Sequence, residues 1–567
     1  MRRDPVIVLK LGGSVLAGEE SLPVAVHEIY RWRRSGFAVV AVVSALAGDT
    51  EALLARAARD GEPSSPHATA ALAKLGELRS AALLGVQLEQ AGVPARVLMP
   101  AALRLRARGD PLDAHPVSLD ATPLRRAFAA GDVAVVPGFF AHDAEGRAVL
   151  LGRGGSDLTA LFLSARLRAR CRLLKDVDGL YTGDPNAPGP APIRYAEASW
   201  DDALATDGTI IQSKAVQLAR AADWPFELAR PGAERATLIG APHARLDAPA
   251  APSRPLRVAL LGLGTVGGGV LAALRCLPEC FQVVAACVRD IGRARPDVPE
   301  GLSLSTDPLA TAASGADVVV EALGGVEPAR TAIAVALRAG AHVVTANKAA
   351  LAAHGAELEA LAAASGRALL ASAAAGGSVP LLPALRRLAR GADCVRLDAV
   401  LNGTTTFVFE ALARGSSLDE ALALARRRGL CERDVQRDLS GRDAADKLVL
   451  AAHAATGCWL DARAIRCTPI RPADLARAQG GAVMRQVATL RRQGGALVGR
   501  VRPMALAPGH PLARARGAGN SAVLLTAGGR TRLHGTGAGR WPTAEAVIGD
   551  LFELVRERER MALADVA

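Results

Sequence analysis

Two short apolar runs, each entering a glycine-rich turn, constrain the fold of this chain more than any other feature. Residues 6–10 (VIVLK) run into the turn at residues 12–14 (GGS), and residues 257–261 (RVALL) run into residues 262–267 (GLGTVG). Both halves then alternate short Val/Leu/Ala runs with amphipathic Ala/Arg/Leu stretches, a pattern typical of parallel α/β sheets. The two turns differ in spacing and flanking chemistry, so the sequence predicts two unrelated α/β units rather than a repeat.

A linker separates the two units. Residues 241–255 (APHARLDAPAAPSRP) are rich in proline and alanine and lack apolar periodicity, and the chain restarts after them with a strand. Such a segment is typical of a connection between domains. With 567 residues, the chain is long enough for about three domains.

The composition argues against several classes of partner. No run of about 20 apolar residues is free of charges or helix breakers, so we expect no membrane span. The N-terminus is typical of a strand rather than a signal peptide, and we expect a cytoplasmic protein. The net charge is +12, but the arginines are scattered along helices with few aromatic residues between them, so we expect no nucleic-acid partner. The eight cysteines show no C-x-x-C spacing, which predicts free thiols and no zinc site.

The lysines mark candidate sites. Only six of the 68 lysines and arginines are lysine, and most of these lie in short glycine- or aspartate-rich motifs. Arginine cannot replace lysine where a compact ammonium must touch a phosphate or where an amine must move a proton. The six are Lys10, Lys74, Lys175, Lys214, Lys348 and Lys447.

The first half collects motifs suited to phosphate transfer. Glycines at 12–14 let backbone N–H groups approach phosphate oxygens, and Lys10 just before them can neutralise a phosphoryl group. A strand followed by a tight turn explains this motif alone equally well. Three further segments follow in this half. A buried strand is predicted at residues 39–45, and a glycine turn that opens a helix is predicted at residues 152–157 (GRGGSD). A loop with several acids is predicted at residues 175–185 (KDVDGLYTGDP).

Together with GELRSAALL at 76–84, these motifs resemble the catalytic domain of aspartate kinases, in the amino-acid kinase family, over residues 5 to about 240. The resemblance implies phosphorylation of L-aspartate by ATP with Mg²⁺, with Lys10 and Asp157 at the phosphates. It assigns aspartate binding to Ser44, Thr50, Glu77 and Arg153, and nucleotide binding to Gly12, Gly13, Ser14, Asp176 and Tyr181. Thr209 stands where the family has a nucleotide-contacting lysine, and we hypothesise that Lys214 supplies this cation instead.

The second half opens with a dinucleotide-binding motif. Residues 262–267 follow a strand and precede an apolar helix, which is the context of a Rossmann fold. The next strand ends at Arg289 and Asp290. An acid there suits the ribose of NAD and an arginine suits the 2′-phosphate of NADP, so NADP is favoured while NAD stays open. The candidate cofactor residues are Gly262, Gly264, Thr265, Val266, Gly267 and Arg289.

A later segment places acids beside a lysine. Asp443 and Lys447 are four residues apart, hence on one face of a helix, and Glu432 and Asp438 precede them. Taken alone, this segment is better explained as a solvated helix N-terminus whose acids complement the helix dipole.

With EALGG at 321–325, VTANK at 344–348 and LNGTT at 401–405, this segment resembles homoserine dehydrogenases over residues 256–567. The resemblance implies NAD(P)H-dependent reduction of L-aspartate 4-semialdehyde to L-homoserine. Lys447 would move the proton beside Asp443, and Thr345 and Asn347 would contact the cofactor. Lys348, Glu432 and Asp438 would bind substrate. Ser372 stands where the family often has a glutamate framing a monovalent-cation site, so cation dependence stays open.

The two resemblances predict a bifunctional enzyme without a pair of small regulatory domains between its halves. We expect a kinase-like α/β domain (1–240), the linker (241–255), a Rossmann domain (256–384), an α+β catalytic and dimerisation domain (385–535) and a segment returning to the Rossmann domain (536–567). A homodimer is expected, and no metal ligand is assigned. Two alternatives remain for the first half: a degenerate nucleotide-binding or dimerisation module, and a kinase for another acidic substrate.

Overall fold

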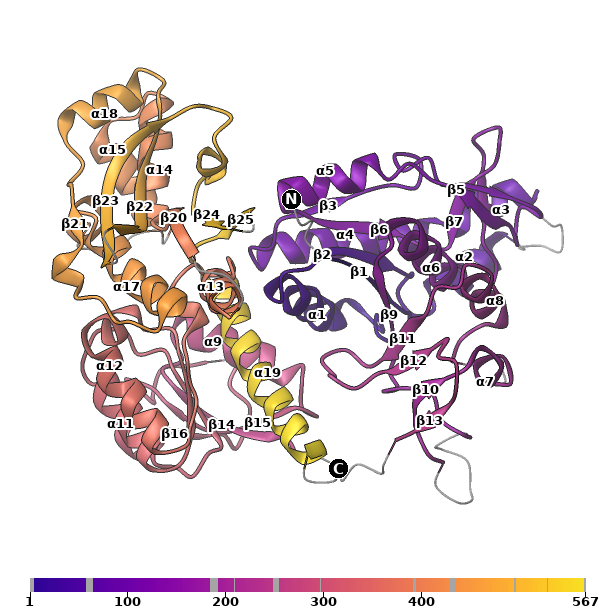
Figure 1. Cartoon of the computed structure of the whole chain (residues 1–567), viewed down its shortest axis with the longest axis horizontal. Helices are drawn as coiled ribbons and strands as arrows, with labels where there is room; N and C mark the ends of the chain where they lie inside the picture. The colour runs from indigo at the N-terminus through magenta and orange to yellow at the C-terminus, as the bar shows by residue number, and fades with distance from the viewer. Residues whose placement is uncertain are drawn as a thin grey trace. The chain divides into compact units, whose positions relative to one another are not determined.

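The chain forms two compact units (Figure 1). The computed structural model describes residues 5–57, 65–183, 192–206, 208, 210–247, 254–295, 297–390, 394–428, 430, 435–493, 496–527 and 529–564. Most of the chain before Arg254 forms the N-terminal unit, and Arg254–Val555 form the main part of the C-terminal unit. Within this described part of the chain, no helix combines the length and apolarity needed to cross a bilayer.

The N-terminal unit is built on a nine-stranded sheet in the order β13-β10-β12-β11-β9-β1-β2-β6-β3. Its centre is β1 (Val6–Leu11), which pairs in parallel with β2 (Ala38–Val43) and β9 (Arg170–Leu174). These strands are almost wholly buried, as expected for parallel strands covered on both faces. The outer strands are β3 (Ala95–Val97), β6 (Val133–Pro137), β10 (Tyr195–Ala198), β11 (Phe226–Ala229), β12 (Thr237–Ile239) and β13 (Arg245–Leu246).

Helices and a small second sheet complete this unit. The four-stranded sheet has the order β5-β4-β7-β8, with β4 (Arg106–Arg108), β5 (His115–Ser118), β7 (Phe140–His142) and β8 (Ala148–Leu150). The helices are α1 (Leu22–Arg34), α2 (Asp49–Ala57), α3 (Pro66–Ala73), α4 (Leu75–Gln90), α5 (Thr122–Ala130), α6 (Gly155–Leu167), α7 (Trp200–Leu204) and α8 (Ser213–Ala221).

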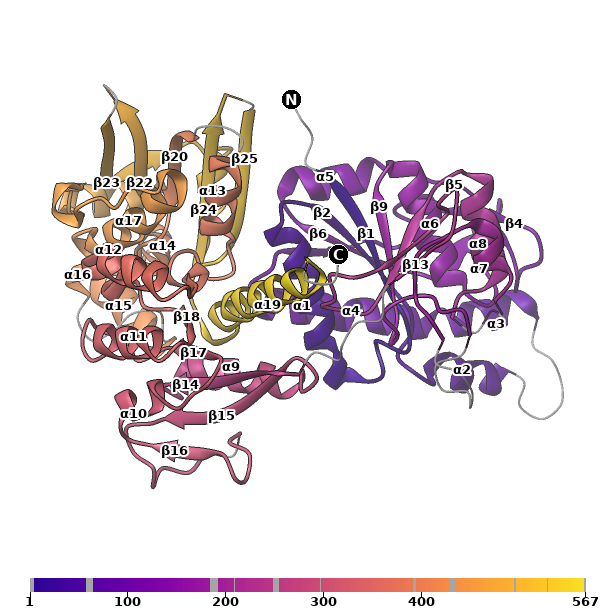
Figure 2. The same ribbon diagram turned by 60° about the horizontal axis from the view of Figure 1, so that its bottom comes forward.

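The C-terminal unit begins with a parallel six-stranded sheet in the order β16-β15-β14-β17-β18-β19 (Figure 2). Numbered from its first strand, this is the 3-2-1-4-5-6 order of the Rossmann fold, whose ligands bind where the order reverses, beside β14. The strands are β14 (Leu256–Leu261), β15 (Phe281–Cys287), β16 (Ser303–Ser305), β17 (Val318–Glu321), β18 (His342–Thr345) and β19 (Leu369–Leu370). The helices are α9 (Thr265–Arg275), α10 (Pro308–Ala312), α11 (Ala329–Arg338) and α12 (Lys348–Ala364).

A second six-stranded sheet, in the order β21-β23-β22-β20-β24-β25, follows in the chain. Its strands are β20 (Cys394–Val400), β21 (Arg466–Cys467), β22 (Val483–Gln493), β23 (Ala496–Leu506), β24 (Gly519–Thr526) and β25 (Gly529–Thr536). Its helices are α13 (Leu381–Ala389), α14 (Gly403–Ala413), α15 (Leu418–Arg427), α16 (Gln436–Leu439), α17 (Arg442–Thr456) and α18 (Pro472–Gln479), before the last helix, α19 (Arg540–Ala564). The predicted fold class, an α/β domain followed by Rossmann and α+β domains, is confirmed.

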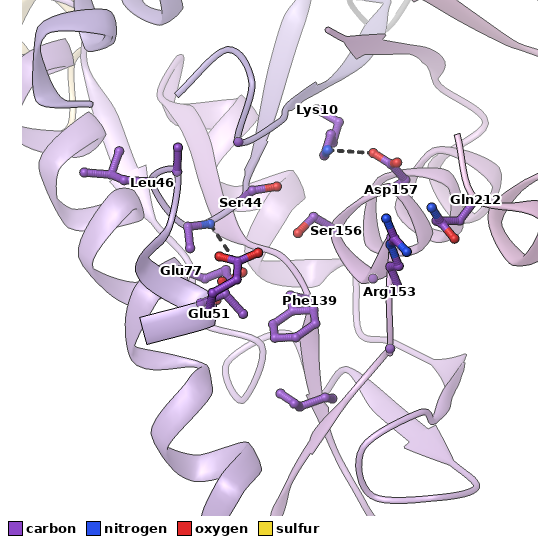
Figure 3. Close-up of a pocket in the computed structure, with 18 of the residues that line it drawn as sticks. Lys10, Ser44, Leu46, Glu51, Glu77, Phe139, Arg153, Ser156, Asp157 and Gln212 are labelled. Carbon is purple, nitrogen blue, oxygen red and sulfur yellow. Dashed lines mark hydrogen bonds and ion pairs between the residues drawn. The ribbon is translucent and has the colours of Figure 1, made fainter. Parts of the chain in front are cut away.

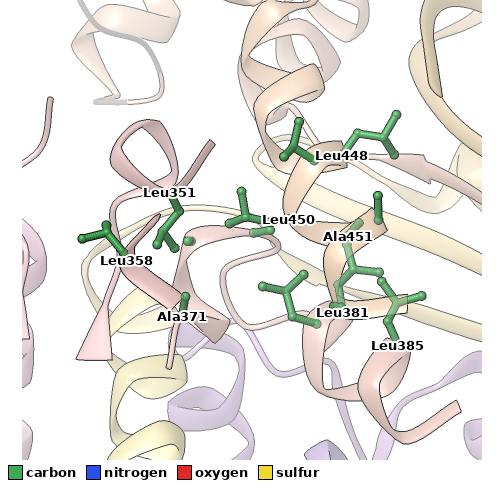
Figure 4. Packing of buried hydrophobic residues seen from close by; sticks show 14 of the residues in the cluster. Leu351, Leu358, Ala371, Leu381, Leu385, Leu448, Leu450 and Ala451 are labelled. Atoms are coloured by element: carbon green, nitrogen blue, oxygen red, sulfur yellow. The ribbon is translucent and has the colours of Figure 1, made fainter. Parts of the chain in front are cut away.

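One hydrophobic core joins the two sheets of the C-terminal unit (Figure 4). Leu351 and Leu358 of α12 belong to it, together with Leu381 of α13 and Leu448 of α17, and none is more than 2% exposed. Each such side chain stabilises the fold by roughly 1.5–3 kcal/mol. Because α12 and α17 share this core, the lysine that begins α12 and the polar residues that begin α17 are held together rigidly.

Candidate active sites

A cavity of about 770 Å³ opens in the N-terminal unit beside Lys10 at the end of β1 and the first turn of α6 (Figure 3). It brings together residues that lie far apart in the sequence. Seven predicted site residues line it: Lys10, Gly13, Ser44, Thr50, Glu77, Arg153 and Asp157. The roles that the resemblance assigns to them stay predictions, but their convergence on one cavity is observed.

Lys10 and Asp157 form a buried ion pair at the wall of this cavity. The Lys10 Nζ lies 2.7 Å from Asp157 Oδ1, and neither side chain is more than 6% exposed. Burial lowers the pKa of Lys10 to about 8, against the attraction of Asp157. Burial alone would raise the pKa of Asp157, but the ammoniums of Lys10 and Lys175 outweigh it and lower that pKa. The carboxylate therefore stays ionised and holds Lys10 in place.

Glu77 presents a buried carboxyl group to the same cavity. Its Oε1 accepts a hydrogen bond from the Ala45 backbone N–H (3.3 Å), whereas its buried Oε2 has no hydrogen-bond partner among the described residues. Burial raises the pKa of Glu77 to about 8. Arg153 reaches the cavity from another side (Figure 3). The cavity therefore offers an acid and a guanidinium to a ligand that carries both an ammonium and a carboxylate.

Several predicted nucleotide residues lie outside this lining. Ser14 and Asp176 are exposed, and the Tyr181 hydroxyl donates to Asp178 Oδ1 (2.8 Å). Lys214 forms an ion pair with Asp113 and donates to the carbonyl oxygens of Ala114 (3.2 Å) and Leu151 (3.1 Å). Thr209 is outside the described residues. Gln212, which lines the cavity, was not among the predicted site residues, although it lies between Thr209 and Lys214 in the sequence.

The glycine turn after β14 has the shape that a dinucleotide site requires. Gly262 has φ +96°, and a Cβ there would lie 2.8 Å from the Ala322 carbonyl oxygen. A Cβ on Gly267 would collide with the Gly262 carbonyl oxygen, so Gly267 allows α9 to approach the strand. Gly264 is the N-cap of α9, with open space around it and no side-chain cap. The free N–H groups of the first turn of α9 can therefore bind a phosphate.

A buried glutamate organises the loops next to this turn. Glu321 accepts hydrogen bonds from the Thr345 hydroxyl, the Leu323 backbone N–H (2.8 Å) and the Asn347 side chain (3.3 Å). Asn347 also donates to the Gly325 carbonyl oxygen (2.7 Å). The side chains of Thr345 and Asn347 thus hold the loops in place. Arg289 and Asp290 are both exposed after β15.

Asp443 is the centre of the second site. Its Oδ1 lies 3.0 Å from Lys348 Nζ, and its Oδ2 lies 2.8 Å from Lys447 Nζ. Lys447 also donates to the Leu401 carbonyl oxygen (2.6 Å). Burial alone would raise the pKa of Asp443, but the two ammoniums hold it well below its usual range. The structure thus brings together three predicted residues from α12 and α17.

Asn402 links this carboxylate to a second one, and sequence reasoning did not single it out. Its Nδ2 donates to Asp443 Oδ2 (2.9 Å) and to Asp438 Oδ1 (2.6 Å), while its Oδ1 caps α14 by accepting from the Thr405 backbone N–H (2.8 Å). Burial raises the pKa of Asp438, against the hydrogen bond from Asn402. The signal was available, because Asn402 follows a strand and precedes GTT, as an N-cap does.

Three further observations concern the predicted substrate residue Glu432, the possible cation site at Ser372, and metal binding. Glu432 is outside the described residues. Ser372 donates through its backbone N–H (2.8 Å) and hydroxyl (2.7 Å) to the buried Asp550 of α19. Among the described residues, no three His, Cys, Asp or Glu side chains are placed to hold a metal ion, and the six cysteines described are free thiols.

Comparisons with known proteins find a family model for each unit of the chain. The amino acid kinase family model matches residues 5–227, the homoserine dehydrogenase NAD-binding domain model matches residues 262–372, and the homoserine dehydrogenase model matches residues 380–552. The chain is 35% identical over 319 residues to the homoserine dehydrogenase of a Synechocystis species, covering 53% of this chain and 73% of that protein. The enzyme of Corynebacterium glutamicum is 35% identical over 327 residues, covering 54% and 73%.

A solved structure supports the same assignment. The crystal structure of a homoserine dehydrogenase from Thiobacillus denitrificans aligns with a TM-score of 0.51 at 33% sequence identity, covering 54% of this chain and 75% of that one. An amino acid kinase domain thus precedes the dehydrogenase domains. This chain belongs to the homoserine dehydrogenase family.

Proposed function

We propose that the C-terminal unit reduces L-aspartate 4-semialdehyde to L-homoserine with a nicotinamide cofactor. The observation that carries this proposal is the pair of ammonium groups, Lys348 and Lys447, held on the buried carboxylate of Asp443. A carbonyl that becomes an alcohol needs a proton donor at its oxygen and cations that orient the acidic substrate. The named activity of the Synechocystis and Corynebacterium relatives supports this reaction.

Lys447 is the group that moves the proton. When bound, the nicotinamide supplies the hydride that reduces the aldehyde carbon. Lys447 gives a proton to the carbonyl oxygen, and its amine takes the proton back in the reverse direction. Asp443 and the Leu401 carbonyl oxygen, 2.8 Å and 2.6 Å from Nζ, orient this ammonium. Lys348 remains a fixed cation that orients the substrate.

The cofactor would be held by the turn at 262–267 and the first N–H groups of α9, which fit a pyrophosphate. We favour NADP over NAD. The Arg289 guanidinium is exposed and suits a 2′-phosphate, whereas Asp290 Oδ1 already accepts from the Gly292 backbone N–H (2.9 Å). Thr345 and Asn347 would act through the loop that they hold in place.

The N-terminal unit is proposed to phosphorylate the side-chain carboxylate of L-aspartate with MgATP. Glu77 and Arg153 would bind the ammonium and a carboxylate of aspartate, with Ser44 and Thr50 beside them. Lys10 and the N–H groups of the glycine turn would neutralise the transferred phosphoryl group. Because the lysines occupy both oxygens of Asp157, the Mg²⁺ would be held chiefly by the phosphates.

We do not favour a degenerate, non-catalytic module for the N-terminal unit. Its cavity retains all four charged residues that the kinase reaction would use: Lys10, Glu77, Arg153 and Asp157. We further propose a cytoplasmic homodimer that assembles through residues 385–535, and a substrate role for Glu432 and Asp438. These proposals extend the family assignment, which by itself covers the dehydrogenase domains.

Two assays on the purified full chain test the proposed function. Aspartyl phosphate is trapped as its hydroxamate with MgATP, using L-glutamate as the alternative acceptor, and reduction of NADP or NAD is followed with L-homoserine. We expect turnover in both, with NADP preferred. If hydroxamate formed only with another acid, that acid and not aspartate would be the phosphoryl acceptor. No hydroxamate from any acid would favour the degenerate module, and no homoserine-dependent reduction would contradict the dehydrogenase.

A further inference from the structure

A second ammonium lies beside Lys10 in the kinase cavity. Lys175 Nζ is 3.1 Å from Asp157 Oδ2, while Lys10 Nζ is 2.7 Å from Asp157 Oδ1, so each carboxylate oxygen has its own lysine. The Lys175 side chain is 14% exposed and lines the cavity. Two positive charges therefore face the cavity over one buried negative charge, which leaves a net positive charge for an anionic ligand.

The backbone brings these two lysines to the same edge of the sheet. Lys10 lies in β1, and Lys175 directly follows β9, which pairs with β1 in parallel. Gly12 lies beneath both side chains: a Cβ there would be 3.0 Å from Lys10 Nζ and 3.8 Å from Lys175 Cδ. The glycine turn that approaches phosphate oxygens thus also gives room for both lysines.

Lys214, the cation expected from the sequence, is used elsewhere. Its ammonium pairs with Asp113 and donates to three carbonyl oxygens, those of Asp113 (3.3 Å), Ala114 (3.2 Å) and Leu151 (3.1 Å). It is absent from the lining of the cavity in the part of the chain that the structure describes. A phosphate could recruit Lys214 only by breaking these contacts, whereas Lys175 is already in place.

We propose that Lys175 is a second phosphate-binding catalytic residue, which holds the transferred phosphoryl group together with Lys10. This inference rests on the proposed kinase function. In the transfer, an oxygen of the acceptor carboxylate donates an electron pair to the γ-phosphorus. The bond from that phosphorus to the bridging oxygen breaks, and its electron pair leaves with ADP. No proton moves, so the site needs fixed positive charge on the phosphoryl oxygens, which two ammoniums held by Asp157 provide without reorganisation.

The test replaces Lys175 with methionine, which keeps an unbranched side chain of similar length and removes the charge. Lys74→Met is the matched control, because Lys74 contacts the Phe140 ring and does not line the cavity. We expect Lys175→Met to lower kcat/KM for ATP by about 100-fold in the hydroxamate assay. MgATP affinity measured by calorimetry should fall about 10-fold, as expected for one lost charge-assisted contact. Homoserine oxidation by the same sample reports that the C-terminal unit is folded, and residual MgATP binding reports the same for the N-terminal unit.

The outcomes separate this inference from the proposed function. If the wild type makes aspartyl phosphate and Lys175→Met retains its kcat and its KM for ATP, the inference is overturned while the kinase stands. If Lys214→Met instead shows the larger loss, the second cation is Lys214. If the wild type makes no acyl phosphate, the proposed function fails. In that case MgATP binding still tests the inference, because equal MgATP affinities of the wild type and Lys175→Met would overturn it. A wild type that neither reacts with nor binds MgATP overturns both.

Discussion

Each unit contains one buried aspartate in contact with two lysines, but the surroundings of these three groups differ between the units. In each, a buried aspartate in the first turn of a helix is contacted by two lysines: Asp157 by Lys10 and Lys175, and Asp443 by Lys348 and Lys447. Both helices begin after a left-handed glycine, Gly154 (φ +75°) or Gly441 (φ +84°), without a side-chain cap. The open N-terminus stabilises the carboxylate in both cases.

The chemistry differs because the surroundings of the three groups differ. Around Asp157 lie a glycine turn and an open cavity, which suit a phosphate that only needs positive charge. Around Asp443 lie Asn402, a second carboxylate at Asp438 and the Leu401 carbonyl oxygen, which suit a lysine that exchanges a proton. We therefore propose that each lysine–aspartate–lysine set fixes positive charge, and that its neighbours decide whether a proton moves.

The strongest test of this difference is Lys447→Arg. The guanidinium keeps the positive charge but cannot release a proton, so we expect dehydrogenase turnover to fall by about 1,000-fold. Binding of NADP, followed by fluorescence titration, should persist, and kinase activity should be unchanged. Near-normal turnover would show that this lysine, like those of the kinase unit, acts only as a charge.

Asp157→Asn tests whether the kinase carboxylate mainly positions the two ammoniums. The variant leaves both lysines without their counter-charge, and we expect kcat for aspartyl phosphate formation to fall by about 100-fold. Homoserine oxidation, measured on the same sample, should stay at the wild-type rate. A loss confined to KM for aspartate would contradict a positioning role at the phosphates.

Asn402→Ser sharpens the role of the amide that distinguishes the dehydrogenase site. Serine still caps α14 but cannot bridge Asp438 and Asp443. Because hydrogen bonds to charged groups contribute about 1.5–3 kcal/mol, we expect kcat to fall by roughly 10- to 100-fold. The pH profile of kcat should also shift, which a merely structural role would not cause. Wild-type kinetics would remove Asn402 from the site.

The smallest effect concerns pH in the kinase unit. The Glu77 carboxyl, whose pKa burial raises to about 8, must be ionised to bind the aspartate ammonium, so activity rises with pH toward that value. The Lys10 ammonium, whose pKa burial lowers to about 8, must stay protonated, so activity falls above it. We expect a bell-shaped profile of kcat/KM centred near pH 8, measured by hydroxamate formation. Glu77→Gln should abolish the acid-side limb, and a flat profile from pH 6 to about 9 would contradict these assignments.

Much of this protein follows from local sequence signals. The alternation of apolar runs and amphipathic stretches predicts the α/β units, because burial on two faces demands apolar strands. The motif at 262–267 predicts a Rossmann turn, because only glycine tolerates the conformation of Gly262 and the helix contact at Gly267. The scarcity of lysine also pointed to Lys10, Lys348 and Lys447, which lie in the two sites.

The tertiary structure decided which side chains meet, because contacts between distant segments depend on strand order and helix packing. Only the pairing of β1 with β9 brings Lys175 beside Lys10, and only the shared core of α12 and α17 brings Lys348 to Asp443. No spacing in the sequence shows that Lys214 pairs with Asp113, or that Asn402 bridges two carboxylates. The sequence by itself determined the fold class and the kinds of groups available, and tertiary packing determined which lysines share each aspartate.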